Sequence, residues 1–77
     1  MRIEINEYIV ADSEICHGQP TFKGTRIMVS IVIEMLRDKA TIREILEAYP
    51  SLSEEHIAAA LQFAAGLVAK RFKLASV

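Results

Sequence analysis

Apolar and polar positions alternate near the start of the chain, as they do in a strand with one buried face. Ile3 and Ile5 fall on one side of such a strand, with polar residues between them. A second apolar cluster, residues 8–10, is followed by the turn-forming pair Asp12-Ser13. Residues 15–17 are predicted to form a brief extended piece. Because two or three short strands are marginally stable alone, we expect helices or a second copy of the chain to cover them.

The spacing of apolar residues changes from two to three or four after residue 28, which predicts helices. A first helix is predicted to open at Val29-Ser30, with Ser30 as its N-cap, and to break at residues 38–40. A second helix is predicted to begin at a capping box, Thr41 to Glu44, and to stop before Pro50.

A third helix is predicted to start at Ser53, which is a suitable N-cap, and to run to about Arg71 or Phe72. Acids at positions 54 and 55 suit the positive end of the helix dipole. The helix is apolar on two sides: one stripe comprises Ile57, Leu61, Ala64, Ala65 and Val68, and the other Ala59, Phe63, Gly66 and Leu67. A helix of this kind has more than one neighbour, and its small residues allow a close approach. We therefore expect a homodimer.

The pattern as a whole predicts a single α+β domain over residues 1–77. Residues 1–28 form its short β portion and a Gly/Pro loop, residues 29–72 a three-helix bundle of helix-turn-helix type (homeodomain-like or winged-helix-like), and residues 73–77 a tail. A chain of 77 residues is close to the size at which one core is barely sufficient. Its hydrophobic content of 52% also favours burial against a second copy or a partner.

Charge and cysteine content narrow the classes of protein. The formal net charge of −1 gives no general support for nucleic-acid binding. One cysteine excludes an internal disulfide framework and suits a reducing cytosol. No segment has the pattern of a secretion signal or a membrane span, so a cytoplasmic protein is predicted.

The stretch between the β portion and the helices carries two of the three glycines and one of the two prolines. Gly18, Pro20 and Gly24 are predicted to shape this loop, because glycine permits positive φ and proline fixes φ. A rigid loop that holds Lys23 and Arg26 would suit an anionic surface, either a phosphate backbone or a carboxylate on a partner.

Two interpretations of Arg26 remain open. Its guanidinium can form a bidentate contact with an anionic partner, or it can hydrogen-bond to carbonyl groups of its own loop or to Asp12. Thr25, between the two cations, belongs to the same candidate surface.

The second and third helices have the lengths and spacing of a helix-turn-helix motif, whose second helix presents its first residues to DNA. Here those residues are Ser53 to His56, and two of them are acids that would weaken binding to DNA. A helical hairpin that only packs is the main alternative. If DNA is bound, we expect contacts from Lys23, Arg26 and Arg43, with Ser53 and His56 as further candidates.

Residues Cys16-His17 and His56 raise the question of a metal or thiol site. One Cys and two His without motif spacing are too few for a zinc site, and no third group is evident to orient a Cys–His pair. The carboxylates show no paired arrangement for acid–base chemistry. We predict neither metal, nor cofactor, nor enzymatic activity.

The end of the chain alternates basic and apolar residues from Lys70-Arg71 to Leu74. It is predicted to be a helix end with cations favourably placed against the dipole, or a segment that docks on an acidic partner.

A resemblance to a known family rests on two runs of the sequence. The first is Asp12 to Arg26, with its Gly-x-Pro and Lys-Gly-Thr-Arg, and the second is Ile45 to Ser53, with its Tyr-Pro-x-Leu-Ser. The chain resembles domain of unknown function 433, a family of small prokaryotic proteins, over nearly its whole length. Family members commonly have glycine where Lys39 stands, proline where Met28 stands and Asp-Pro at Ser13.

The resemblance implies a helix-turn-helix-like antitoxin encoded beside a toxin with a PIN-like nuclease fold. It would bind and neutralise that toxin and repress its own operon, with no membrane association. The alternatives are a stand-alone DNA-binding regulator and a structural module that only dimerises.

Overall fold

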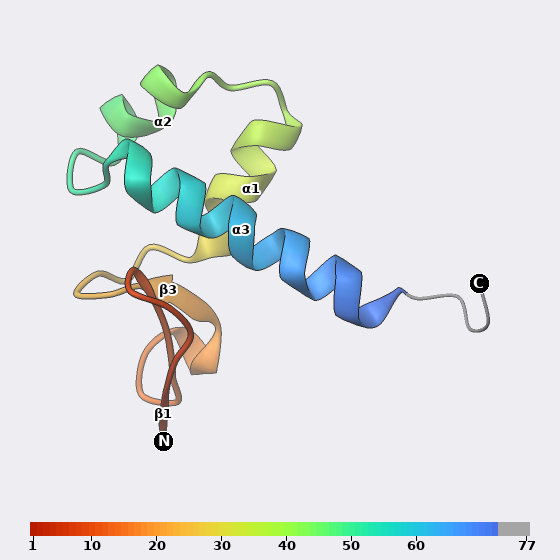
Figure 1. Cartoon of the computed structure of the whole chain (residues 1–77). Helices are drawn as coiled ribbons and strands as arrows, with labels where there is room; N and C mark the ends of the chain where they lie inside the picture. Colours follow the sequence, from red (N-terminus) through yellow and green to blue (C-terminus); the bar gives the residue numbers. More distant parts are fainter. Residues whose placement is uncertain (73–77) are drawn as a thin grey trace.

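A computed structural model describes residues 1–72 of the chain (Figure 1). Three strands come first and three helices follow. The elements are β1 (Arg2–Glu4), β2 (Ile9–Asp12), the single turn η1 (Cys16–Gly18), β3 (Pro20–Phe22), α1 (Val29–Arg37), α2 (Ile42–Ala48) and α3 (Glu54–Arg71). The predicted α+β class is confirmed.

The strands form one antiparallel sheet in the order β1-β2-β3. Ile9 on β2 lies opposite Phe22 on β3, and both side chains are fully buried against the helices. Val10 on β2 is also buried. The other residues of the cluster around Ile9 and Phe22 come from the helical half: Val29, Val32, Ile45, Leu52, Ile57 and Ala60. The first half of α3 thus helps to hold the sheet and the helices together.

The prediction of an extended piece over residues 15–17 is wrong. The amides of Gly18 and Gln19 donate to the carbonyls of Ile15 and Cys16, at 3.0 and 3.1 Å, and close the turn η1. Cys16 and His17 have φ of 49° and 55°, in the left-handed region that residues other than glycine rarely adopt. The chain reverses here, ahead of β3.

The N-cap of α1 is Met28, and the prediction of Ser30 is wrong. Met28 has an extended backbone (φ −73°, ψ 136°) and pairs with Thr21 as an isolated β-bridge. The helix therefore begins immediately after this bridge, and Ser30 lies exposed in its first turn.

The predicted capping box of α2 is confirmed. The Glu44 amide donates to the Thr41 hydroxyl at 3.0 Å, and the Thr41 amide donates to the Glu44 carboxylate at 2.8 Å. The helix ends before Pro50, as predicted.

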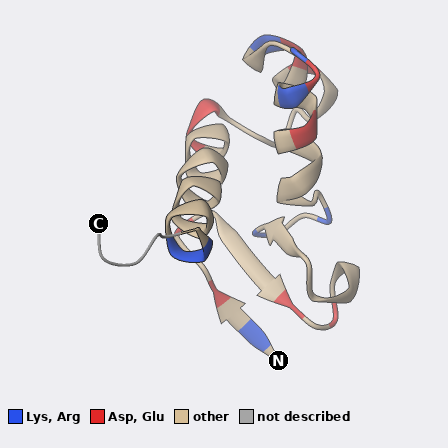
Figure 2. Cartoon of the chain, turned by 90° about the vertical axis from the view of Figure 1, so that its right-hand side faces the viewer, with Lys and Arg blue, Asp and Glu red and all other residues tan. Residues whose placement is uncertain are grey.

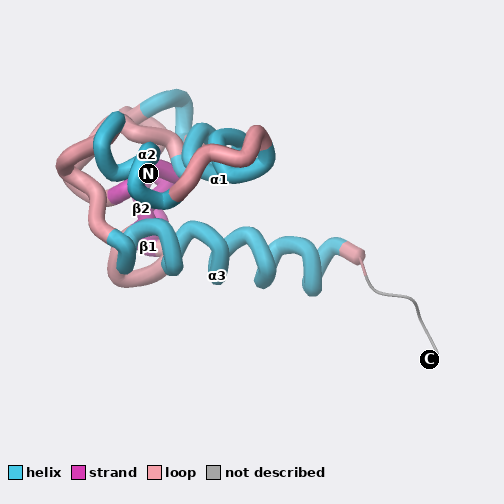
Figure 3. Tube along the Cα trace, turned by 90° about the horizontal axis from the view of Figure 1, so that it is seen from above, coloured by secondary structure: helices cyan, strands magenta, loops and turns pink. Residues whose placement is uncertain are grey.

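Helix α3 extends well past the rest of the molecule, so its last turns stand clear of the sheet and of α1 (Figures 1 and 3). Leu67, Val68 and Phe72 are exposed there. Among residues 1–72, no helix combines the length and apolar character needed to cross a membrane.

The end of α1 is a Schellman motif with lysine in the place of the usual glycine. The Lys39 amide donates to the Leu36 carbonyl and the Ala40 amide to the Met35 carbonyl, at 3.0 and 2.9 Å. Lys39 adopts φ 69°, and its side chain is exposed. The structure therefore keeps the left-handed turn and accepts lysine in it.

Lys39→Gly is expected to raise the free energy of unfolding by about 1 kcal/mol, because the left-handed conformation no longer carries a Cβ penalty. Urea denaturation followed by circular dichroism measures this. Lys39→Ala is the matched control: it removes the charge but keeps the Cβ, so its midpoint should stay close to that of the wild type. An equal gain in both variants would assign the effect to charge.

Candidate functional site: the Lys23–Arg26 loop

The loop after β3 is a tight turn fixed by its own backbone. The Phe22 amide donates to the Ile27 carbonyl at 3.1 Å, and the Thr25 amide donates to the Phe22 carbonyl at 3.0 Å. Gly24 has φ 75°, as a glycine in the third position of a type II turn does. Residues 23–26 therefore form a loop that the backbone hydrogen bond between Phe22 and Ile27 closes.

The Thr25 hydroxyl locks this turn from inside. It donates to the Phe22 carbonyl at 2.8 Å and accepts from the Ile27 amide at 3.0 Å. Its single proton and one lone pair are thus used within the loop. Thr25 was predicted to belong to the binding surface, and the structure gives it the task of fixing the loop's shape.

The Lys23 ammonium is engaged within the chain. It donates to the carboxylate of Glu4, the last residue of β1, at 2.8 Å. The Arg2 guanidinium also binds Glu4, at 3.2 Å. Lys23 is therefore largely neutralised, whereas the sequence suggested that both cations of the loop face a partner.

The pKa of Glu4 is lowered from its ordinary value, first by the hydrogen bond from Lys23 and then by that from Arg2. A carboxylate with a lowered pKa contributes stability above the pKa of the unfolded chain. This contribution is lost as the pH falls through the lower pKa of the folded chain. Because Glu4 is exposed and Lys23 is only half-buried, solvent screens the pair and its energetic effect is small.

We expect Lys23→Met to raise the pKa of Glu4 toward its ordinary value, and Arg2→Met to raise it less, since Arg2 makes the longer contact. The carboxyl carbon of Glu4, followed by NMR over a pH titration, reports this directly. A Glu4 pKa that does not respond to Lys23→Met would show that the ion pair is absent in solution.

Arg26 is the exposed cation of the loop. Within residues 1–72 its guanidinium makes no hydrogen bond and no ion pair. The backbone carbonyl of Arg26 accepts a hydrogen bond from the Cys16 thiol at 3.5 Å, and this bond connects the loop to η1. Asp12, the internal partner considered from the sequence, lies 3.7 Å from Arg2 instead. The structure thus favours the interpretation in which Arg26 is available to a partner.

The other basic candidates are not gathered around this loop. Arg43 lies exposed on α2, and Lys70 and Arg71 lie exposed at the end of α3, which extends past the rest of the molecule (Figures 1 and 2). Of the predicted C-terminal docking segment, Lys73 and Leu74 lie outside the described residues. Within residues 1–72, these basic side chains therefore lie at separate places and form no continuous basic face.

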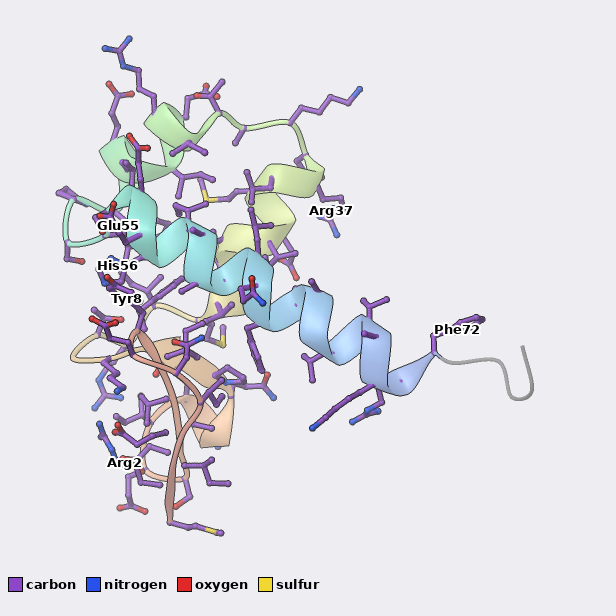
Figure 4. The ribbon with its side chains drawn as sticks, viewed as in Figure 1. Arg2, Tyr8, Arg37, Glu55, His56 and Phe72 are labelled. Carbon is purple, nitrogen blue, oxygen red and sulfur yellow. The ribbon has the colours of Figure 1, made fainter. Side chains whose placement is uncertain are left out.

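His56 and Ser53, predicted as binding residues, have structural tasks at the start of α3. The Ser53 amide donates to Nδ1 of His56 at 3.0 Å, and the Ser53 hydroxyl lies 2.9 Å from the same nitrogen. The ring of His56 also packs edge-on against Tyr8 and Phe22, with centroids 4.9 and 5.6 Å away (Figure 4). His56 thus joins the third helix to the sheet.

The Cys16-His17 pair lies on the left-handed turn described above. Among the described residues, no group of three or more His, Cys, Asp or Glu side chains is arranged to hold a metal ion.

Sequence reasoning missed an apolar groove between α1 and α3. It has a volume of about 390 Å³ and is lined mainly by Pro20, Val29, Ile33, Phe63 and Leu67, with Glu34 at its edge. The second apolar stripe of the third helix was the signal for it, since Phe63 and Leu67 belong to that stripe.

The sequence profile of one family, described as "Protein of unknown function (DUF433)", matches residues 9–64. The matched region contains β2, the Lys23–Arg26 loop and the helical half as far as Ala64. No curated protein and no solved structure matches the chain significantly.

Proposed function

The chain belongs to the DUF433 family of proteins of unknown function, and for this member we propose the role of antitoxin in a type II toxin–antitoxin pair. In this role it binds a nuclease toxin with a PIN-like fold and neutralises it, and it catalyses no reaction itself. The observation that carries the proposal is Arg26: an exposed guanidinium, unpaired within residues 1–72, on a loop held by hydrogen bonds.

The chemistry of the loop suits an acidic target. A PIN-like nuclease holds its metal with carboxylates, and a guanidinium can bind a carboxylate through two parallel hydrogen bonds. Because the turn is already fixed by Thr25 and Gly24, little backbone conformational entropy is lost when the loop docks. Arg26 placed among these carboxylates would block the access of substrate to them.

Co-expression with the protein encoded by the neighbouring reading frame tests this role. We expect the tagged chain to retain that protein in a pull-down, and to restore growth to cells that express it alone at toxic levels. The absence of a complex with any small protein encoded next to this chain would remove the antitoxin role.

A second candidate, DNA binding at its own promoter, is supported by the α2–α3 arrangement and by the exposed Arg43. The exposed acids Glu54 and Glu55 at the start of α3 oppose the usual placement of this helix in the major groove. DNA contact would therefore come from Arg26 and Arg43. Either role places the protein in the cytoplasm.

Fluorescence anisotropy with the chain's own promoter distinguishes this second role. Specific binding should weaken steeply as salt is added, because phosphate contacts release counterions. Binding that is absent at low salt, or that is unchanged when Lys23 and Arg26 are both replaced by alanine, would exclude a role of the loop in DNA recognition.

A further inference from the structure

The outward face of α3 carries a regular stripe of exposed positions. Their spacing of four, three, four, three and four residues is that of the a and d positions of a coiled-coil heptad. These positions, called the α3 seam below, are Glu54, Ala58, Leu61, Ala65, Val68 and Phe72. Each of the six is exposed, and the last five are apolar.

Within residues 1–72, every position of the α3 seam is exposed. Seen from above, α1 and α2 lie on one side of α3, and a loop of the β portion passes beneath its start (Figure 3). The contacts of α3 with the core come from a different face, through Ile57 and Ala60. Leu61 is 47% exposed, Val68 66% and Phe72 77%. Large apolar side chains aligned in this way mark an interaction surface.

We propose that the α3 seam binds the α3 seam of a second copy of this chain, with the two helices antiparallel. In the symmetric arrangement Ala58 faces Val68 of the second copy, and Leu61 faces Ala65 of the second copy. Each of these layers places a small side chain against a large one, and symmetry repeats them. The pairing therefore fills the space between the helices evenly, as knobs-into-holes packing requires.

The charges of α3 select the antiparallel direction. Its only acids, Glu54 and Glu55, lie at its start, and its only bases, Lys70 and Arg71, lie at its end (Figure 2). Antiparallel pairing brings the acidic start of each helix beside the basic end of the other, and it also opposes the two helix dipoles. A parallel pair would instead bring like charges together at both ends.

This surface is separate from the proposed toxin-binding loop. Arg26 lies on the turn after β3, whereas the seam lies on the outer side of α3. The dimer can therefore be tested without a partner protein, and its failure would leave the antitoxin proposal standing.

Light scattering coupled to size-exclusion chromatography gives the first test. The wild type should have twice the mass of the chain at micromolar concentrations. Val68→Lys should raise the dissociation constant at least about tenfold, because it removes a valine that the dimer would bury and adds a charge at the seam. Gly66→Lys is the matched control: it adds the same charge two residues away on another side of the helix, and the dimer should persist.

Circular dichroism should show both variants folded, since positions 66 and 68 are exposed in the single chain. A monomeric wild type, or equal effects of Val68→Lys and Gly66→Lys, would overturn the proposal.

Cysteine cross-linking tests the register, in a Cys16→Ser background. A mixture of Ala58→Cys and Val68→Cys chains should form a disulfide between the two variants, because the antiparallel register puts these positions face to face. Neither variant should cross-link to itself, since its two copies would lie about 15 Å apart along the helix axis, too far for a disulfide. Self-linking of each variant without mixed linking would show a parallel pair and overturn the register.

Discussion

His56→Ala is expected to lower the free energy of unfolding by about 2–4 kcal/mol, the largest loss of stability that we expect from a side chain that is not fully buried. The substitution removes the acceptor for the Ser53 amide at the start of α3, which is worth about 1 kcal/mol. It also removes two edge-to-face contacts, with Tyr8 and Phe22, each worth about 0.5–1.5 kcal/mol. For a domain of this size such a loss is a large share of the total stability.

Chemical denaturation measures the loss, and His56→Glu separates its parts. Glutamate at this position can still accept from the Ser53 amide and suits the positive end of the helix, but it cannot replace the aromatic contacts. We therefore expect His56→Glu to recover about 1 kcal/mol of the loss. A His56→Ala variant within about 0.5 kcal/mol of the wild type would show that this residue does not join α3 to the sheet, since changes of this size are usual for plain surface positions.

If the proposed toxin is the partner, Arg26→Glu is expected to weaken its binding at least about 100-fold, because the substitution places a carboxylate against the carboxylates of the target. The side chain is exposed and has no partner within residues 1–72, so the stability of the free protein should change by less than about 0.5 kcal/mol. Isothermal titration calorimetry on the purified pair gives the dissociation constants.

Arg43→Glu is the matched control for this measurement. Arg43 is also an exposed arginine with no partner in the described part of the chain, but it lies on α2. The same change of charge there should alter the affinity by less than about tenfold, since it acts only through long-range electrostatics. If both reversals weaken binding equally, the toxin responds to overall charge and the role of the loop is lost.

Local signals in the sequence predicted most of the helical half. The capping box at Thr41 and the stop before Pro50 depend on residues within one turn of each other, so they can be read without knowledge of the fold. The same holds for the start of α3 at Ser53. The prediction of Ser30 as an N-cap was wrong because the pairing of Met28 with Thr21, a tertiary contact, decides where α1 begins.

The candidate site was harder to predict because distant residues determine it. Lys23 is paired with Glu4, 19 positions earlier, and the pairing of β1 with β2 and of β2 with β3 is needed to bring them together. His56 was considered for DNA contact because it lies in the first turn of a helix. The aromatic rings that its imidazole contacts, those of Tyr8 and Phe22, come from the β portion of the chain. Of the three residues predicted to shape the loop, only Gly24 lies in its turn: Gly18 ends η1, and Pro20 begins β3, where it pairs with Ala11. The turn at Gly24 was predicted because a glycine is a local signal.

The Lys23–Arg26 loop, whose Arg26 is unpaired within residues 1–72, is the surface that we propose to meet an acidic partner. NMR spectra of the isotope-labelled chain, recorded as the proposed toxin is added, test this role most directly. We predict that the amides of residues 23–26 and the side-chain Nε–H of Arg26 shift or broaden first and most strongly. Changes confined to α2 and α3, with the loop signals unmoved in a formed complex, would contradict this account.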